Sequence, residues 1–199
     1  MSAAQVLLAS ASPRRSELLR QVGIAHEVRP VDIDESVRTG EAPSAYVLRL
    51  AEAKAAALWQ QLGPGERRLV LAADTTVALE GEIFGKPGSL AEVRAMLGRL
   101  SGRTHEVHTA VAVLHAGGSG ARVSSSSVSM RELSPAEIDW YWSTGEPADK
   151  AGGYAVQGRA AAFICHIAGS YSGIMGLPLY ETWELLAPVL GLTAGGRQA

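Results

Sequence analysis

The chain of 199 residues is 47% hydrophobic and 19% charged, and its formal net charge is −2 at neutral pH. This balance is typical of a globular protein, and it argues against a disordered chain and against a basic surface for long nucleic acid. No apolar run reaches the ~18 residues of a membrane-spanning helix, so we expect a cytoplasmic location.

Hydrophobic periodicity and turn residues predict alternating strands and helices. The expected elements are, in chain order, a strand near 5–10, a helix at 13–22, a strand near 26–33, a helix at 43–62, a strand near 68–74, a hairpin through 76–84, a helix from Ser89 to about 99, strands near 104–115 and 121–131, a helix at 134–143, strands near 153–157 and 161–168, and a helix at 178–190. Hairpin turns at 79–82 and 116–120 make part of the sheet antiparallel. We therefore expect an α/β fold with a mixed sheet, one domain over 1–190 and a loose tail over 191–199.

The helix expected at 13–22 begins with Arg14 and Arg15, a charge that is unfavourable beside the partial positive charge of a helix N-terminus. Two other predicted helices begin conventionally, with Glu three residues after Ser89 and Ser134. An anion held between the arginines and the free N–H groups of the helix would explain the exception. Arginines that extend into water would explain it equally well.

A lysine interrupts the apolar stripe of the helix expected at 43–62. At about 100° per residue, Lys54 falls near the middle of this stripe. Because lysine is almost never fully buried unless it is paired, either its stem extends outward or its ammonium meets an anion in a cleft.

Two acidic residues occupy positions where a ligand could bind. Glu35 keeps the parity of Val31 and Ile33, so it points inward if the strand continues that far, and it then suits a Mg²⁺ ligand. A strand that ends at Asp34 is the alternative. Asp74 ends an apolar strand, where ligands of open α/β sheets gather, although a turn-forming aspartate is also common there.

Lysine, histidine and cysteine side chains elsewhere give weaker indications of a binding or metal site. Lys86 precedes the helix that begins at Ser89, a place where it could meet phosphate. His105 and His108 should point to opposite faces of a strand, which argues against a shared metal ion. The single cysteine, Cys165, excludes an internal disulfide and is expected to be a small buried side chain.

Six motifs in a fixed order resemble those of the Maf family, the septum-formation-inhibitor-like nucleoside triphosphate pyrophosphatases. They span nearly the whole chain and are LLASASPRRSELL, RLAEAKA, LAADTTVALEGEIFGKP, LSGRTHEVHTAVAV, DKAGGYAVQG and GSYSGIMGLPLYET. The resemblance implies a twisted, mixed β-sheet flanked by helices, with two lobes around a nucleotide cleft, as in Maf-like and ITPase-like proteins.

Within the family, the chain is similar to the branch that acts on dTTP and UTP rather than on 7-methyl-GTP. Arg14, Thr75 and Gln157 stand where the other branch tends toward Trp, Gln and Glu. The Gln157 amide could pair with uracil or thymine, but it could also flip to suit cytosine, so the shape of the pocket must contribute to the exclusion of CTP.

The resemblance implies hydrolysis between the α and β phosphates, with a nucleoside monophosphate and pyrophosphate as products. Asp74 would deprotonate the attacking water, and Glu35 and Asp74 would hold Mg²⁺ or Mn²⁺. The remaining implied contacts are Ser10, Arg15, Lys54 and Lys86 to the triphosphate, and Arg14, Thr75 and Gln157 to the rest of the nucleotide, with Arg14 also within reach of the phosphates.

Two other functions remain open at this point. One is a nucleotide-sensing regulator of cell division or septum formation that needs no catalysis, and the other is a 7-methyl-GTP-directed or broad-range pyrophosphatase. The expected ligand is a small nucleoside triphosphate, including modified pyrimidine triphosphates, rather than a nucleic acid polymer or a membrane. A homodimer is compatible with such an enzyme. Lys150 could either contact phosphate or brace a loop.

Overall fold

The computed structural model of this protein describes residues 5–63, 65–66 and 68–192. A seven-stranded mixed sheet runs through it in the order β2-β1-β3-β5-β6-β7, and β4 pairs with β3. The strands are β1 (Val6–Leu8), β2 (His26–Val28), β3 (Leu69–Leu79), β4 (Glu82–Phe84), β5 (Thr104–His115), β6 (Gly118–Met130) and β7 (Ile164–Ala168). The predicted α/β fold with a mixed sheet flanked by helices is confirmed.

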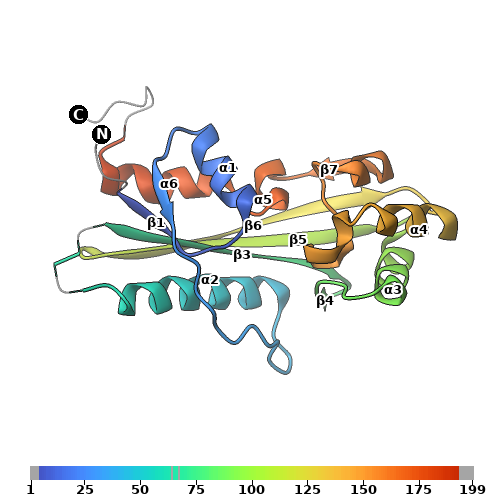
Figure 1. Ribbon diagram of the computed structural model, residues 1–199, viewed down its shortest axis with the longest axis horizontal. Coiled ribbons are helices and arrows are strands. Elements are labelled where there is room, and N and C mark those ends of the chain that lie inside the picture. Colours follow the sequence, from blue (N-terminus) through green and yellow to red (C-terminus); the bar gives the residue numbers. More distant parts are fainter. Residues whose placement is uncertain (1–4, 64, 67, 193–199) are drawn as a thin grey trace.

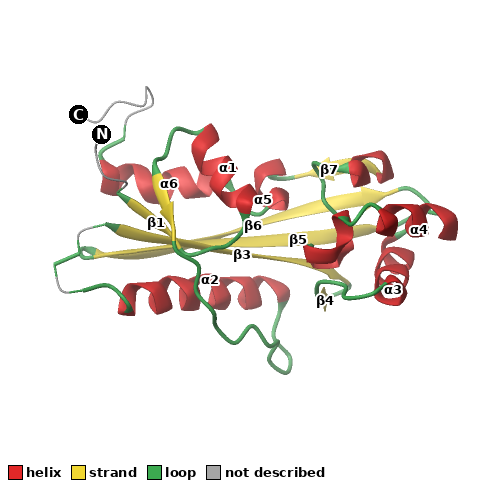
Figure 2. Ribbon diagram, viewed as in Figure 1, coloured by secondary structure: helices red, strands yellow, loops and turns green. Residues whose placement is uncertain are grey.

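Helices cover both faces of this sheet (Figures 1 and 2). They are α1 (Pro13–Gln21), α2 (Pro43–Gln60), α3 (Leu90–Leu100), α4 (Pro135–Ser143), α5 (Tyr171–Met175) and α6 (Leu179–Leu190), with the 3₁₀ helices η1 (Glu146–Asp149), η2 (Ala151–Gly153) and η3 (Arg159–Phe163). Helix α2 lies along one face, whereas α1, α5 and α6 lie on the other (Figure 1). Throughout the described residues, every helix is too short or too polar to span a bilayer.

The apolar run of β3 is continuous because both faces of the strand are buried. Val70 and Ala72 pack with the apolar side chains of α2, whereas Leu71 and Ala73 pack with those of α1 and α6. A third core lies farther along the sheet, where Val77 packs with side chains of α3 and α4. The helices therefore form two groups along one sheet, at the left and right of Figure 1.

One edge of β3 is open between these two groups. Residues 69–71 pair with β1, and residues 77–79 pair with β4. On the other edge, β5 pairs continuously with β3 from Val70 to Ala78. Among the described strands none pairs with residues 72–76 on the open edge, so this part of β3 is left without a partner strand on one side.

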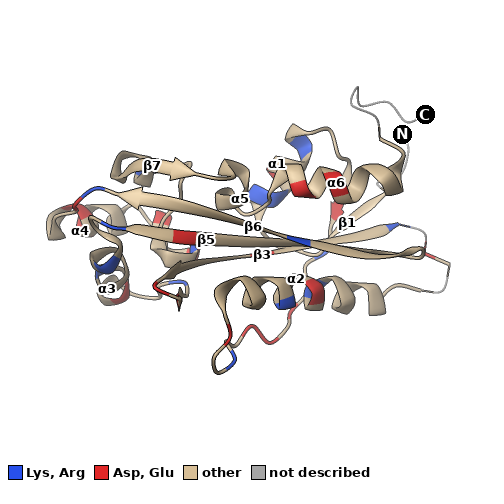
Figure 3. Cartoon of the chain, turned by 180° about the vertical axis from the view of Figure 1, so that it is seen from behind, with Lys and Arg blue, Asp and Glu red and all other residues tan. Residues whose placement is uncertain are grey.

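Two predicted strand ends are wrong. The strand near 26–33 ends at Val28 because its only partner among the described strands is the three-residue strand β1. The parity that placed Glu35 on a strand therefore does not apply. Asp74 does not end its strand either, since β5 supports β3 as far as Ala78. Asp74 is the only charged residue of β3, and the central strands carry few charges in Figure 3.

Three further expectations also fail, all in the last third of the chain. The strand near 153–157 is replaced by η2 and a turn, because Gly152 and Gly153 have φ angles of 67° and 72°. Helix α5 was not expected, since five residues are too few for a periodic pattern. Cys165 is exposed on the edge strand β7 rather than buried. From residue 193 onward, the expected tail lies outside the described residues.

Candidate active site

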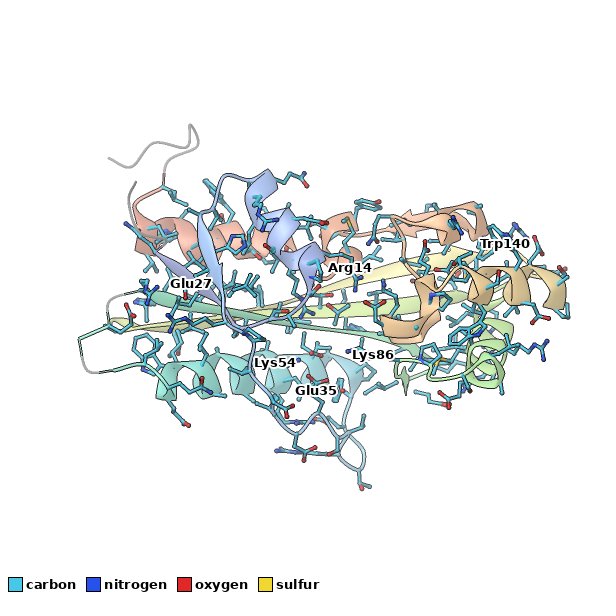
Figure 4. All side chains as sticks on the ribbon, in the orientation of Figure 1. Arg14, Glu27, Glu35, Lys54, Lys86 and Trp140 are labelled. Atoms are coloured by element: carbon cyan, nitrogen blue, oxygen red, sulfur yellow. The ribbon has the colours of Figure 1, made fainter. Side chains whose placement is uncertain are left out.

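A cavity of about 330 Å³ lies at the open edge of β3. Of the nine site residues expected from the sequence, eight line it and Asp74 does not. The eight are Ser10, Arg14, Arg15, Glu35, Lys54, Thr75, Lys86 and Gln157. In Figure 4, the four of them that are labelled gather near the middle of the molecule, while the labelled Glu27 and Trp140 lie toward opposite ends.

Lys54 joins the two carboxylates of the site. Its Nζ atom lies 2.6 Å from Glu35 Oε1 and 2.7 Å from Asp74 Oδ1, and its side chain is only 10% exposed. The neighbouring positions of α2 on the same stripe are apolar and buried, as the helical pattern predicted. The ammonium therefore meets anions in a cleft, and in the structure these anions belong to the protein.

The two carboxylates differ in their affinity for protons. Burial raises the pKa of Asp74 above its ordinary value, although the charges of Lys54 and Arg15 oppose this. Burial acts in the same direction on Glu35, but the hydrogen bond and charge of Lys54 outweigh it and lower the pKa of Glu35. Such a divergence within one site is typical of acid–base chemistry, because one group stays ionised while the other accepts a proton.

Glu35 reaches the site from a loop rather than from a strand. Arg49 of α2 holds this loop by donating to Glu41 at 2.6 and 2.7 Å and to the carbonyl of Ser36 at 3.0 Å. Tyr46, also on α2, donates to the carbonyl of Glu35 at 3.0 Å. The loop and Lys54 are thus positioned by the same helix.

Arg15 connects four parts of the chain on the opposite face of β3. It donates to the carbonyl of Gly176 at 2.7 Å, to Ser10 Oγ at 3.0 Å and to Thr75 Oγ1 at 3.2 Å. Thr109 on β5 lies 3.0 Å from the same Thr75 oxygen. Burial lowers the pKa of Arg15. One of the two first-turn arginines therefore serves protein acceptors at the wall of the cavity rather than water.

The start of α1 lacks the features that stabilise the starts of α3 and α4. Ser12 makes no side-chain cap and no acidic residue lies in the first turn, whereas Ser89 and Ser134 both accept from the N–H of the Glu three residues on. Ser12 and Pro13 line the cavity. The free N–H groups at this end and the partial positive charge of the helix therefore suit an anionic ligand.

A third acidic residue meets cations at the other side of the cavity. Asp149 accepts a hydrogen bond from Lys150, and Asp149 Oδ2 lies 3.8 Å from Arg14 Nη1. Lys150 also lies 3.4 Å from the carbonyl oxygen of Glu146. Lys150 therefore both lines the cavity and braces the chain between η1 and η2.

His105 and His108 contact different parts of the chain. His105 Nε2 lies 2.7 Å from Tyr154 Oη, and His108 Nδ1 lies 2.8 Å from Ser125 Oγ. Over residues 5–63, 65–66 and 68–192, no group of three or more His, Cys, Asp or Glu side chains could hold a metal ion by itself. A metal ion at Glu35 and Asp74 would thus need further ligands from the substrate and from water.

Sequence reasoning missed several contacts of the site. Thr109 interrupts the buried apolar positions 107, 111 and 113 on one face of β5, and this break in the alternation was a usable signal. Asp149 stands beside Lys150 in DKAGGY, but its contact with Arg14 crosses the cavity. The Gly176 carbonyl that accepts from Arg15 has no signal in the sequence at all, because every residue carries one.

Known proteins are similar to this chain over nearly its whole length. A family model described as Maf-like protein matches residues 5–189. A dTTP/UTP pyrophosphatase of Anaeromyxobacter sp. strain Fw109-5 is 52% identical over 187 residues, which cover 92% of this chain and 88% of the relative. The dTTP/UTP pyrophosphatase of Methylobacillus flagellatus is 53% identical over 182 residues, which cover 92% and 91%. Among solved structures, the Staphylococcus aureus Ham1 protein has a TM-score of 0.43 and 18% identity over 63% of this chain and 71% of that chain.

Proposed function

The chain belongs to the Maf family, and from this membership we propose that it hydrolyses dTTP and UTP to the monophosphate and pyrophosphate. One observation carries the chemistry: Lys54 holds two carboxylates of different proton affinity beside a cavity lined by cations. The names of relatives about half identical over more than nine-tenths of the chain support the choice of substrates. A binding protein would need the cations but not a buried carboxylate whose pKa is raised.

The triphosphate would bind where cations and hydrogen-bond donors line the cavity. Ser10, Arg15, Lys54 and Lys86 are the proposed phosphate contacts, together with the uncapped start of α1. Arg14, Thr75 and Gln157 are proposed to contact the rest of the nucleotide, with Arg14 also within reach of the phosphates. Lysine and arginine at these places would stabilise the negative charge that develops on the transferred and leaving oxygens.

The donor set at Lys54 fits a divalent metal ion. Glu35 and Asp74 contact one ammonium from two sides, so they would hold a cation in the same place once Lys54 moves. Mg²⁺ is commonly held by one or two carboxylates together with substrate phosphates and water. A bound Mg²⁺ or Mn²⁺ would supply positive charge to the phosphate oxygens.

Asp74 is proposed to accept the proton of the attacking water. The water oxygen bonds to the α-phosphorus, the bond from this phosphorus to the oxygen shared with the β-phosphate breaks, and pyrophosphate leaves with that oxygen. Asp74 is 7% exposed and bonded to Lys54, so it becomes available when the phosphates draw the ammonium away. Catalytic contacts often form only in the substrate complex.

The direct test is turnover of a panel of canonical and modified triphosphates by the purified protein. With Mg²⁺ or Mn²⁺ we expect UTP and dTTP to give UMP or dTMP and pyrophosphate, and we expect EDTA to stop the reaction. Tight binding without pyrophosphate release would instead indicate a nucleotide sensor. Faster hydrolysis of 7-methyl-GTP would place the protein in the other branch of the family.

A small change in substrate affinity is expected when Asp149 is replaced. Its side chain is 69% exposed and contacts Arg14 and Lys150, so it would compete with phosphate for these two cations. Asp149→Asn removes this competing charge, so the KM for UTP should fall about two- to fivefold, as for an exposed ion pair. Steady-state kinetics would measure it. A raised KM would mean that Asp149 holds the two cations in place for the substrate.

A further inference from the structure

Two side chains outside the cavity lining, Tyr141 and Glu146, form hydrogen bonds with the turn that carries Gln157. Tyr141 of α4 is fully buried, donates to Glu146 Oε1 at 2.6 Å and accepts from the N–H of Ala155 at 3.1 Å. Ala155 and Gln157 do line the cavity. One phenol oxygen therefore links the cavity wall to a carboxylate outside it.

Glu146 fastens the other end of the same turn. Its Oε2 accepts from the N–H of Arg159 at 3.1 Å, and its carboxylate lies so close to Gly158 that a Cβ there would be 2.3 Å from Oε1. Burial would raise the pKa of Glu146, but hydrogen bonds from Tyr141 and from backbone N–H groups lower it. Glu146 thus holds one end of residues 155–159 directly and the other end through Tyr141, and a Cβ at residue 158 would displace its carboxylate.

Gln157 needs such support because its own amide does not select one base. The side chain is exposed at the cavity and lies on a turn rather than on a strand. An amide can present either its oxygen or its nitrogen, so it suits cytosine as well as uracil after a flip. Discrimination between uracil and cytosine then depends on where the backbone places Gln157 relative to the rest of the cavity.

We propose that Tyr141 and Glu146 are positioning residues that set the preference for uracil and thymine over cytosine through the turn at Gln157. This inference rests on the proposed function, because it assigns the base to this turn. It predicts an effect on recognition of the base and none on binding of the phosphates, because the proposed phosphate contacts lie outside the turn. These contacts are Ser10, Arg15, Lys54 and Lys86.

Tyr141→Phe tests the inference, because it removes the oxygen and keeps the ring that packs against Phe163 with centroids 5.4 Å apart. We expect the ratio of kcat/KM for UTP over CTP to fall about five- to tenfold, as for the loss of one or two hydrogen bonds. Inhibition by inorganic triphosphate should not change. Glu146→Gln, which keeps the shape of the acceptor, should reduce the ratio less than Glu146→Ala.

Tyr180→Phe is the matched control, since Tyr180 is 74% exposed on α6, and all its constants should equal those of the unaltered protein. Calorimetry gives the ratio of the binding affinities for UTP and CTP, which should fall in the same direction. A lack of catalysis would therefore overturn the proposed function and leave the positioning role measurable. A Tyr141→Phe variant that loses UTP, CTP and inorganic triphosphate in equal proportion would overturn the inference. So would a lower melting temperature with an unchanged ratio.

Discussion

Replacing Asp74 by Asn should lower kcat for UTP by roughly 10²–10⁴-fold, which is the usual contribution of a general base. The amide has the same shape and can still accept from Lys54, but it cannot take a proton from water. The fold should persist, because the hydrogen bond at 2.7 Å retains an acceptor. Stopped assays of pyrophosphate release would measure the loss.

The pH dependence of UTP hydrolysis gives a second test of Asp74 as the general base. Burial raises the pKa of Asp74 above its ordinary value of 3.8, so the catalytic form appears only as the pH rises through this higher pKa. The acid limb of kcat/KM, which reports groups of the free protein, should therefore lie above the ordinary aspartate value and should disappear in the Asn variant. Asp139→Asn is a suitable control, because Asp139 is a partly exposed partner of Arg94. Turnover within a few-fold of the unaltered protein would exclude Asp74 as the base.

The helices were predictable to within one or two residues, apart from the short α5. Their ends carry local signals: α4 begins at a Ser134–Glu137 capping box, and α6 ends at Gly191 in the left-handed conformation. Strand ends were less predictable, because the length of a strand is set by its partner. β3 continues past Asp74 only because β5 pairs with it, and β2 stops early because β1 is short.

The site residues also differ in whether a local pattern in the sequence reveals them. Residues that break a local pattern, such as Arg14 at a helix start and Lys54 in an apolar stripe, could be found from the sequence, and both line the cavity. Tyr141 and Glu146 break no pattern, since their hydrogen bonds to the Gln157 turn exist only after α4, η1 and η3 have packed together. Sequence reasoning therefore found the charged side chains that face the cavity, apart from Asp149, but not the side chains that support them.

Replacing Lys54 by Met should raise the pKa of Asp74 and lower kcat at neutral pH by about 10²-fold or more. Burial and the negative charge of Glu35 raise this pKa, whereas Lys54 and Arg15 lower it. Without Lys54, burial and the charge of Glu35 raise the pKa of Asp74 further. The acid limb of kcat/KM should therefore move to higher pH. Glu35→Gln should have the opposite effect and move the titration of Asp74 to lower pH. Carboxyl ¹³C NMR of the free protein would measure both shifts without turnover.

The Met variant should also be less stable, because two carboxylates lose the cation that both contact. Removing one partner of a buried pair costs about 3 kcal/mol of unfolding free energy at neutral pH. A carboxyl group whose pKa is higher in the folded than in the unfolded state favours folding at low pH, and this contribution is lost as the pH rises through the folded value. The destabilisation should therefore be larger at neutral pH than in acid.

Kinetic measurements distinguish a Lys54 that binds phosphate from a Lys54 that only forms a structural ion pair. If Lys54 moves from the carboxylates to the phosphates when the substrate binds, the Met variant should lose triphosphate affinity as well as kcat, and inorganic triphosphate should inhibit it poorly. Lys54→Arg should recover part of the affinity, because a cation returns to the cleft, although the planar guanidinium differs in shape from an ammonium. A lower melting temperature with unchanged kcat, KM and Asp74 titration would show instead that Lys54 only holds the two carboxylates together.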